Sequence, residues 1–140
     1  MSNPIPQGKY VIASRYGDLI WTAGMTPRVD GIMLRPGKVS GDEPSLEVYR
    51  ESVAQAAANA LSAAKSKLHE GEQIKQILRM TAYIAANTAF TRHAELADMA
   101  SDYLYNQLGP VASCARVSVG VAGLPGNAPI EIQLLVAVGK

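Results

Sequence analysis

The sequence predicts an α+β fold, a sandwich in which two helices pack on one face of a mixed β-sheet. Apolar residues make up 48% of the 140 residues, which is enough for the core of one domain spanning residues 1–140. Two segments, 44–70 and 91–108, repeat small or apolar residues at helical spacing, and several shorter segments alternate apolar and polar residues. Helices and strands within one short chain are typical of such a sandwich.

The first third of the chain predicts a strand pair followed by an irregular segment. Strands are expected at 11–14 and 18–23, on either side of a turn at Tyr16-Gly17. Residues 24–44 then contain seven glycines and prolines. This density of helix- and strand-breaking residues predicts a turn-rich excursion with at most a short strand near 32–34.

Two helices and a strand are expected next. The first helix begins near Pro44, which has no backbone N–H to lose, and ends at Gly71. A strand is predicted over 73–85, and its uneven apolar spacing indicates a bulge or an irregular turn. The second helix covers 91–108, where Gly109-Pro110 stops it.

The last third predicts two strands with clear alternation. Apolar residues occupy every second position in 116–121 and again in 130–138. The loop 123–127 contains two glycines and a proline, so the two strands are most simply joined as a hairpin.

The composition excludes several functional classes. Thirteen Lys and Arg against twelve Asp and Glu give a net charge of +1, which is unlike the basic surface of nucleic-acid-binding proteins. Two histidines and one cysteine predict no metal site and no internal disulfide. The glycines match no nucleotide-binding pattern, so no cofactor is expected. The absence of a signal sequence in Met1–Pro4 and of a long apolar run predicts a cytoplasmic protein without a membrane segment.

Two charges stand out in the last part of the chain. After Asp102 the only charged side chains are Arg116, Glu131 and Lys140. An arginine can bind a carboxylate with two parallel hydrogen bonds, and a glutamate can act as acid or base, so the two residues are candidate catalytic groups. A structural ion pair, or a position on a solvated sheet edge, explains them equally well. Strand parity alone leaves open whether they share a face, lie on separate faces or meet between subunits.

Other polar residues have plain structural explanations beside functional ones. His93 is expected to be a solvated helix residue, and Cys114 a buried thiol with no redox or nucleophilic role. Arg28 lies in the irregular segment, where a solvated loop arginine is the simpler interpretation and a pocket rim that selects anions the functional one. Tyr10 suits an edge strand as well as a cleft, and Asn87 suits a turn or helix cap.

The chain also resembles the RidA/YjgF family over nearly its whole length. The most specific part is the segment from Arg116 through Leu124-Pro125 to Ile130-Glu131-Ile132. The next is the strand and turn Trp21–Pro27, followed by Asn59-Ala60-Leu61 in the first predicted helix. Short segments such as Pro27-Arg28 resemble a branch of the family distinct from its best-known imine deaminases.

This resemblance implies a chorismate-mutase-like fold and a homotrimer with ligand clefts between subunits. It further implies cofactor-free hydrolysis of reactive enamines and imines to 2-oxo acids and ammonia. In the family, the arginine at Arg116 binds the substrate carboxylate and the glutamate at Glu131 places or activates water. The substrate-binding positions match Tyr10, Ala23, Gly24, Asn87 and Ser118.

One position departs from the deaminase pattern. Family deaminases commonly carry serine where this chain has Ala23, so a hydroxyl contact to substrate is lost. The expected activity is therefore enamine or imine deamination, with a non-catalytic binding or sensor protein for small carboxylate metabolites as the alternative. Ribonuclease activity, a third role attached to the family, is disfavoured by the neutral charge.

Overall fold

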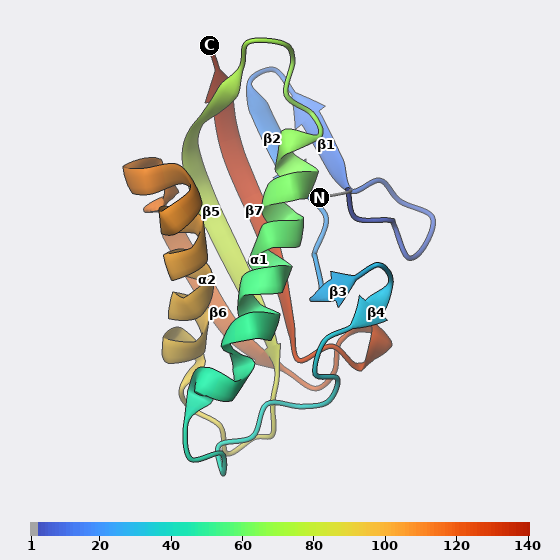
Figure 1. Ribbon diagram of the computed structural model, residues 1–140, viewed down its shortest axis with the longest axis vertical. Coiled ribbons are helices and arrows are strands. Elements are labelled where there is room, and N and C mark those ends of the chain that lie inside the picture. The colour runs from blue at the N-terminus through green and yellow to red at the C-terminus, as the bar shows by residue number, and fades with distance from the viewer. Residues whose placement is uncertain (1–2) are drawn as a thin grey trace.

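The computed structural model describes residues 3–140, so Met1 and Ser2 of the segment expected to lack a signal sequence lie outside it. Two helices lie over one face of a five-stranded mixed sheet, as the sequence predicts (Figure 1). The order of strands across the sheet is β1-β2-β7-β5-β6. No helix within residues 3–140 is long and apolar enough to span a bilayer.

The strand order follows from one central strand and its neighbours. The strands are β1 (Ala13–Tyr16), β2 (Leu19–Thr22), β5 (Gln73–Ala85), β6 (Ala115–Val121) and β7 (Ile130–Gly139). β7 is antiparallel to both β2 and β5, whereas β5 and β6 run parallel. The predicted irregularity of β5 is confirmed, because its pairing with β7 shifts register between Ile74 and Gln76 and between Ile77 and Arg79.

The turn-rich excursion contains the predicted short strand and a partner for it. β3 (Arg28–Val29) and β4 (Ile32–Met33) form a small antiparallel sheet of their own. The tight turn between them places Asp30 and Gly31 at positive φ, a conformation that suits Asp and Gly better than most residues. This small sheet holds residues 24–33 beside the main sheet, where they form one wall of the site described below.

The helices bury small residues against the sheet. α1 (Arg50–Lys65) follows a short 3₁₀ helix, η1 (Leu46–Tyr49), whose first turn is capped by the Ser45 hydroxyl. Alanines fill the buried face of α1 and let it approach β7 closely. α2 (His93–Leu108) continues into η2 (Gly109–Ala112) and provides the crossover between the parallel strands β5 and β6.

The predicted hairpin of the last two strands is wrong. β6 and β7 do not pair with each other, and β5 lies between them (Figure 1). The connecting segment, including η3 (Pro125–Asn127), therefore carries the chain across the end of β5. Burial explains the outcome: every second residue of β7 is buried, so it takes a central position, whereas no residue of β6 is fully buried and it forms an edge.

Candidate functional site

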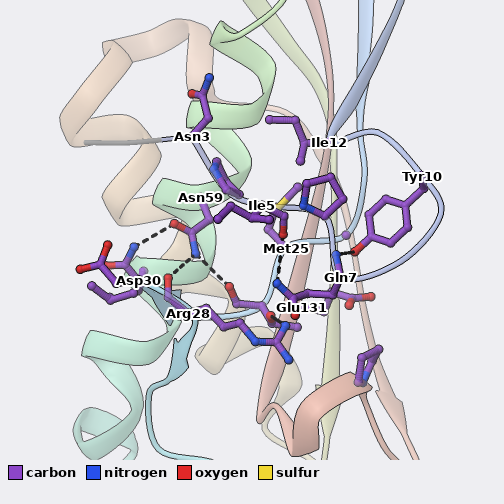
Figure 2. Close-up of a pocket in the computed structure, with 18 residues that line it drawn as sticks. Asn3, Ile5, Gln7, Tyr10, Ile12, Met25, Arg28, Asp30, Asn59 and Glu131 are labelled. Atoms are coloured by element: carbon purple, nitrogen blue, oxygen red, sulfur yellow. Dashed lines mark hydrogen bonds between the residues drawn. The ribbon is translucent and has the colours of Figure 1, made fainter.

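A cavity of about 220 Å³ lies where the N-terminal segment, the loop after β2, α1 and β7 meet (Figure 2). We call it the Glu131 pocket. Its lining residues are Asn3, Pro4, Ile5, Pro6, Gln7, Tyr10, Ile12, Gly24, Met25, Thr26, Arg28, Val29, Asp30, Gly31, Gln55, Asn59, Pro125 and Glu131. Ligand pockets commonly measure roughly 300–1,000 Å³, so this cavity suits a small metabolite.

Glu131 is seated against the backbone of Gly24. A Cβ atom at position 24 would lie 2.6 Å from both Cδ and Oε2 of Glu131, closer than real carbon atoms approach. Met25 fixes this arrangement, because its backbone N–H donates to the carbonyl of Ile132 and its carbonyl accepts from the Ile132 N–H, at 2.8 and 2.9 Å. The absence of a side chain at Gly24 therefore allows the carboxyl group its place in the pocket.

Partial burial changes the acidity of Glu131. Loss of solvent raises the pKa of this carboxyl above its ordinary value, and the positive charge of Arg28 lowers it in part. A carboxyl group with a raised pKa holds a proton closer to neutral pH, which suits an acid or base in proton transfer.

Arg28 is held in place from two sides. Its Nη1 donates to Thr26 Oγ1 at 2.9 Å. Its Nη2 lies directly against Gly126, where any side chain would overlap the guanidinium. Figure 2 shows the side chain reaching from β3 toward Glu131. The functional interpretation of Arg28 as a residue of the pocket is thus the one that the structure supports.

Asn59 connects α1 to this wall. Its Nδ2 donates to the backbone carbonyls of Thr26 and Arg28, both at 2.9 Å. Its Oδ1 accepts from Gln55 Nε2, also at 2.9 Å. Asn59 is buried, and these bonds use both of its N–H groups, so it is a positioning residue that holds the loop bearing Arg28.

Arg116 lies elsewhere in the same chain. Its guanidinium donates to Asp98 Oδ1 at 2.7 Å, to Ser101 Oγ at 3.0 Å and to the carbonyl of Ala94 at 3.2 Å, all on α2. An open depression surrounds it, lined by Ser101, Asp102, Tyr105, Ala112, Ser113, Cys114 and Arg116. Within one chain, Arg116 is therefore not part of the Glu131 pocket.

The sheet register explains this separation. Arg116 pairs with Met80 and Glu131 pairs with Tyr83. Paired residues share a face of the sheet, and residues an odd number apart on one strand point to opposite faces. Met80 and Tyr83 are three apart, so Arg116 points toward the helices and Glu131 toward the open face. The sequence leaves open whether Arg116 and Glu131 share a face of the sheet, and the register shows that they lie on opposite faces.

The other predicted substrate-binding residues divide in the same way. Tyr10 and Gly24 line the Glu131 pocket, where the Tyr10 hydroxyl accepts a hydrogen bond from the Gln7 N–H at 3.0 Å. Ser118 shares the helix face of β6 with Arg116 because it pairs with Ala82. Asn87 is exposed in the turn after β5, and Ala23 packs against the core next to the pocket.

Cys114 and His93 are both partly buried, so Cys114 is less enclosed than the buried thiol expected from the sequence. Burial raises the pKa of the Cys114 thiol, while a hydrogen bond with the Met80 backbone and the charge of Arg116 lower it. His93 makes an edge-to-face contact with Phe90 at 5.0 Å and lies against Gly120. In residues 3–140, no group of three His, Cys, Asp or Glu side chains is placed to hold a metal ion.

Comparison with known proteins identifies the family. The family model described as endoribonuclease L-PSP matches residues 1–138. The chain belongs to the L-PSP family. This is the YjgF/RidA family that the sequence motifs indicate, and the L-PSP fold of its solved members agrees with the sandwich described above.

Individual relatives of the L-PSP family match nearly the whole chain. Protein TCP17 of Trypanosoma cruzi is 28% identical over 139 residues, which cover 96% of this chain and 84% of that protein. The structure of Atu1372 from Agrobacterium tumefaciens, a protein of unknown function, is 25% identical with a TM-score of 0.86, covering 97% and 87% of the two chains. The Escherichia coli YjgF gene product is 20% identical with a TM-score of 0.67, covering 96% and 92%.

Two positioning features of this L-PSP site escaped prediction from sequence. Asn59 matched the family motif, but its bonds to the loop could not be foreseen. A polar residue inside the apolar stripe of α1 was the available signal. Gly126 lies in the predicted loop 123–127, and nothing in the sequence indicates that Arg28 packs on it.

Proposed function

We propose that the protein hydrolyses small 2-imino acids and their enamine tautomers to 2-oxo acids and ammonia. The observation that carries this proposal is the Glu131 pocket: a half-buried carboxyl group with a raised pKa, seated on a glycine in a small, partly apolar cavity. Membership of the L-PSP/RidA family supports a small-molecule function of this kind.

The chemistry needs only water and a group that moves protons. With the imine nitrogen protonated, Glu131 takes a proton from water as the oxygen attacks the carbon of the C=N bond, which leaves a hydroxyl and a neutral amine on that carbon. Glu131 then gives its proton to the amine, the C–N bond breaks and ammonia leaves, and the hydroxyl loses its proton to the Glu131 carboxylate or to water as the carbonyl forms. One water is consumed, and no oxidant or reductant takes part.

Arg116 enters the site from a neighbouring subunit in this proposal. The open face of the sheet exposes Trp21, Val117 and Val119, with exposed fractions of 36%, 46% and 37%. Apolar side chains gathered on one sheet face favour association with other copies. Because β6 is an edge strand, a homotrimer interface that covers this face and extends around the β6 edge can bring Arg116 of one chain to the Glu131 pocket of the next, where its guanidinium would bind the substrate carboxylate.

Asp98 opposes this role, because it already pairs with Arg116 at 2.7 Å. The side chain of Asp98 is largely exposed, so this ion pair is weak and a substrate carboxylate can compete for the arginine. Ser118, Asn87 and Ala23 are proposed to line the same inter-subunit cleft.

A non-catalytic binding protein is the second candidate. Position 23 supplies no hydroxyl, and the Ala23 side chain packs against the core.

Ribonuclease activity is the third candidate function, and the residues that line the pocket disfavour it. Among the lining residues that lie within the described part of the chain, 3–140, Arg28 is the one cation, beside the carboxylates Asp30 and Glu131. A nucleic-acid backbone needs several cations along a track.

The test follows the decay of imines. An amino acid oxidase generates 2-imino acids from several amino acids, and semicarbazide traps what remains, with and without this protein. We expect faster loss of the imine in its presence. Arg116→Ala should lower kcat/KM by about tenfold or more, and Glu131→Gln by about a hundredfold.

The control is Arg92→Ala, on the exposed surface, where the Arg92 side chain has Glu95 as its one ion-pair partner among residues 3–140. It should keep the wild-type rate. No acceleration for any imine refutes the hydrolase and leaves the binding protein. Full activity of Arg116→Ala refutes its assigned role.

A further inference from the structure

Arg28 differs from most arginines of the described chain in having no acidic partner. Within residues 3–140, no carboxylate lies within 4.0 Å of its guanidinium. Five other arginines make such ion pairs: Arg15, Arg35, Arg50, Arg92 and Arg116. The charge of Arg28 therefore faces the Glu131 pocket without a direct counter-ion.

The guanidinium is also pre-positioned. Thr26 accepts a hydrogen bond from Nη1, Gly126 supports Nη2, and the terminal methyl of Met33 packs on the same glycine. Asn59 holds the backbone carbonyl of Arg28 from α1. A planar arginine fixed in this way loses little conformational entropy when it binds an anion, and its free N–H groups match the two oxygens of a carboxylate.

We propose that Arg28 binds a second carboxylate of the ligand, so that the protein prefers small dicarboxylic imino and oxo acids to monocarboxylic ones. This inference rests on the proposed function, in which Arg116 of a neighbouring chain takes the carboxylate next to the C=N bond. Arg28 is then left for an acidic group at the other end of a short carbon chain.

The surrounding charges are compatible with this assignment. Glu131 and Asp30 are the carboxylates that line the same pocket. Asp30 is exposed at the turn between β3 and β4, so solvent screens it. The pocket wall also contains the apolar residues Ile12, Met25 and Val29, which suit the methylene groups of the ligand.

The experiment measures binding of two stable 2-oxo acids, 2-oxoglutarate and 2-oxobutyrate, by isothermal titration calorimetry. The unmodified protein should bind 2-oxoglutarate about tenfold or more tightly. Arg28→Gln should remove this preference, because it weakens 2-oxoglutarate much more than 2-oxobutyrate. Arg28→Lys should retain part of it, and Thr26→Val should reduce it, because the hydroxyl that orients Nη1 is lost. Arg92→Gln is the matched control and should bind as the wild type does.

Equal affinity for the two acids in the unmodified protein overturns the inference, and so does absence of 2-oxoglutarate binding. A preference that survives in Arg28→Gln also overturns it. If Arg28→Gln does not fold, as judged by circular dichroism, the inference is still tested by the affinities of the two acids for the unmodified protein and for Arg28→Lys. Retained dicarboxylate preference without hydrolysis of any imine refutes the proposed function alone, whereas hydrolysis without the preference refutes this inference alone.

Discussion

Gly24 shows how one missing side chain shapes the site. The carboxyl group of Glu131 occupies the space that a Cβ atom would need, at 2.6 Å. The backbone of Gly24 does not lie at positive φ, so alanine is conformationally acceptable there and the conflict is with Glu131 alone. A substitution of Gly24 by alanine therefore tests the position of the Glu131 carboxyl group with little disturbance of the backbone.

We expect Gly24→Ala to displace Glu131 and lower kcat/KM for imine hydrolysis on the order of a hundredfold, because small misplacements of a reacting group are costly. The imine-trapping assay measures it. Gly123→Ala is the control, since no atom lies within 4 Å of a Cβ there and φ is ordinary. Wild-type activity in a folded Gly24→Ala variant contradicts the role of Glu131.

The residue scale also shows what sequence reasoning can find. Glu131 and Arg116 were visible because charges are rare in an apolar stretch, where they need partners or solvent. Their placement on opposite faces depends on the register of β5 with its two neighbours, which involves residues over 30 positions away. For Arg28 the sequence offers both a solvated loop arginine and a pocket residue. It cannot decide between them, because the position of the side chain depends on Thr26, Asn59 and Gly126 together.

At the scale of elements, one ion pair joins β1 to the turn after α1. Arg15 donates to both oxygens of Glu72, at 2.6 and 2.9 Å, and to the carbonyl of Lys67 at 2.9 Å. Hydrogen bonds from Arg15 and then from the His69 N–H lower the pKa of Glu72 to about 2. The ionised form of Glu72 is therefore favoured by the fold.

This pair predicts a pH dependence of stability. The lowered pKa means that the contribution of Glu72 is present above about 4.5 and is lost as pH falls toward about 2. Glu72→Gln should destabilise the protein at pH 7, and the difference from wild type should shrink between pH 4.5 and 2. Urea unfolding measures both. Exposed Glu70→Gln is the control, and a constant difference across that range contradicts the prediction.

The elements themselves were largely predictable, whereas one pairing was not. Alternation identified 116–121 and 130–138 as strands, and a short Gly/Pro loop suggested a hairpin. β7 buries every second residue on one face, and Leu135 and Ala137 add apolar side chains to the other face beside Glu131 and Gln133. So apolar a strand suits a central position with a partner on each side. β6 carries Arg116 and Ser118 and forms an edge. The spacing of apolar residues within a strand identifies the strand but does not determine which distant strand it pairs with.

At the scale of the whole molecule, the open sheet face predicts self-association. Val119 is 37% exposed in the single chain, a position where lysine should be tolerated by an isolated subunit. In a trimer that covers this face, the same lysine would be buried without a partner. We expect the wild type to have the mass of three subunits in light scattering and Val119→Lys to dissociate.

Val48→Lys provides the comparison, because Val48 is 40% exposed and lies in η1, away from the sheet face. It should remain trimeric. A wild type with the mass of one subunit contradicts the trimer and the inter-subunit cleft with it. Dissociation of both variants shows general loss of stability and contradicts a specific role for the sheet face.

The central position of β7 also determines when the protein can fold. β2 and β5 are neighbours of β7 and not of each other, so a nascent chain lacking residues 130–139 has two additional unpaired strand edges in place of one continuous sheet. During synthesis, stable folding must wait until these residues leave the ribosome, and until then the exposed edges are open to aggregation. The strand that carries Glu131 is thus also the one that completes the sheet.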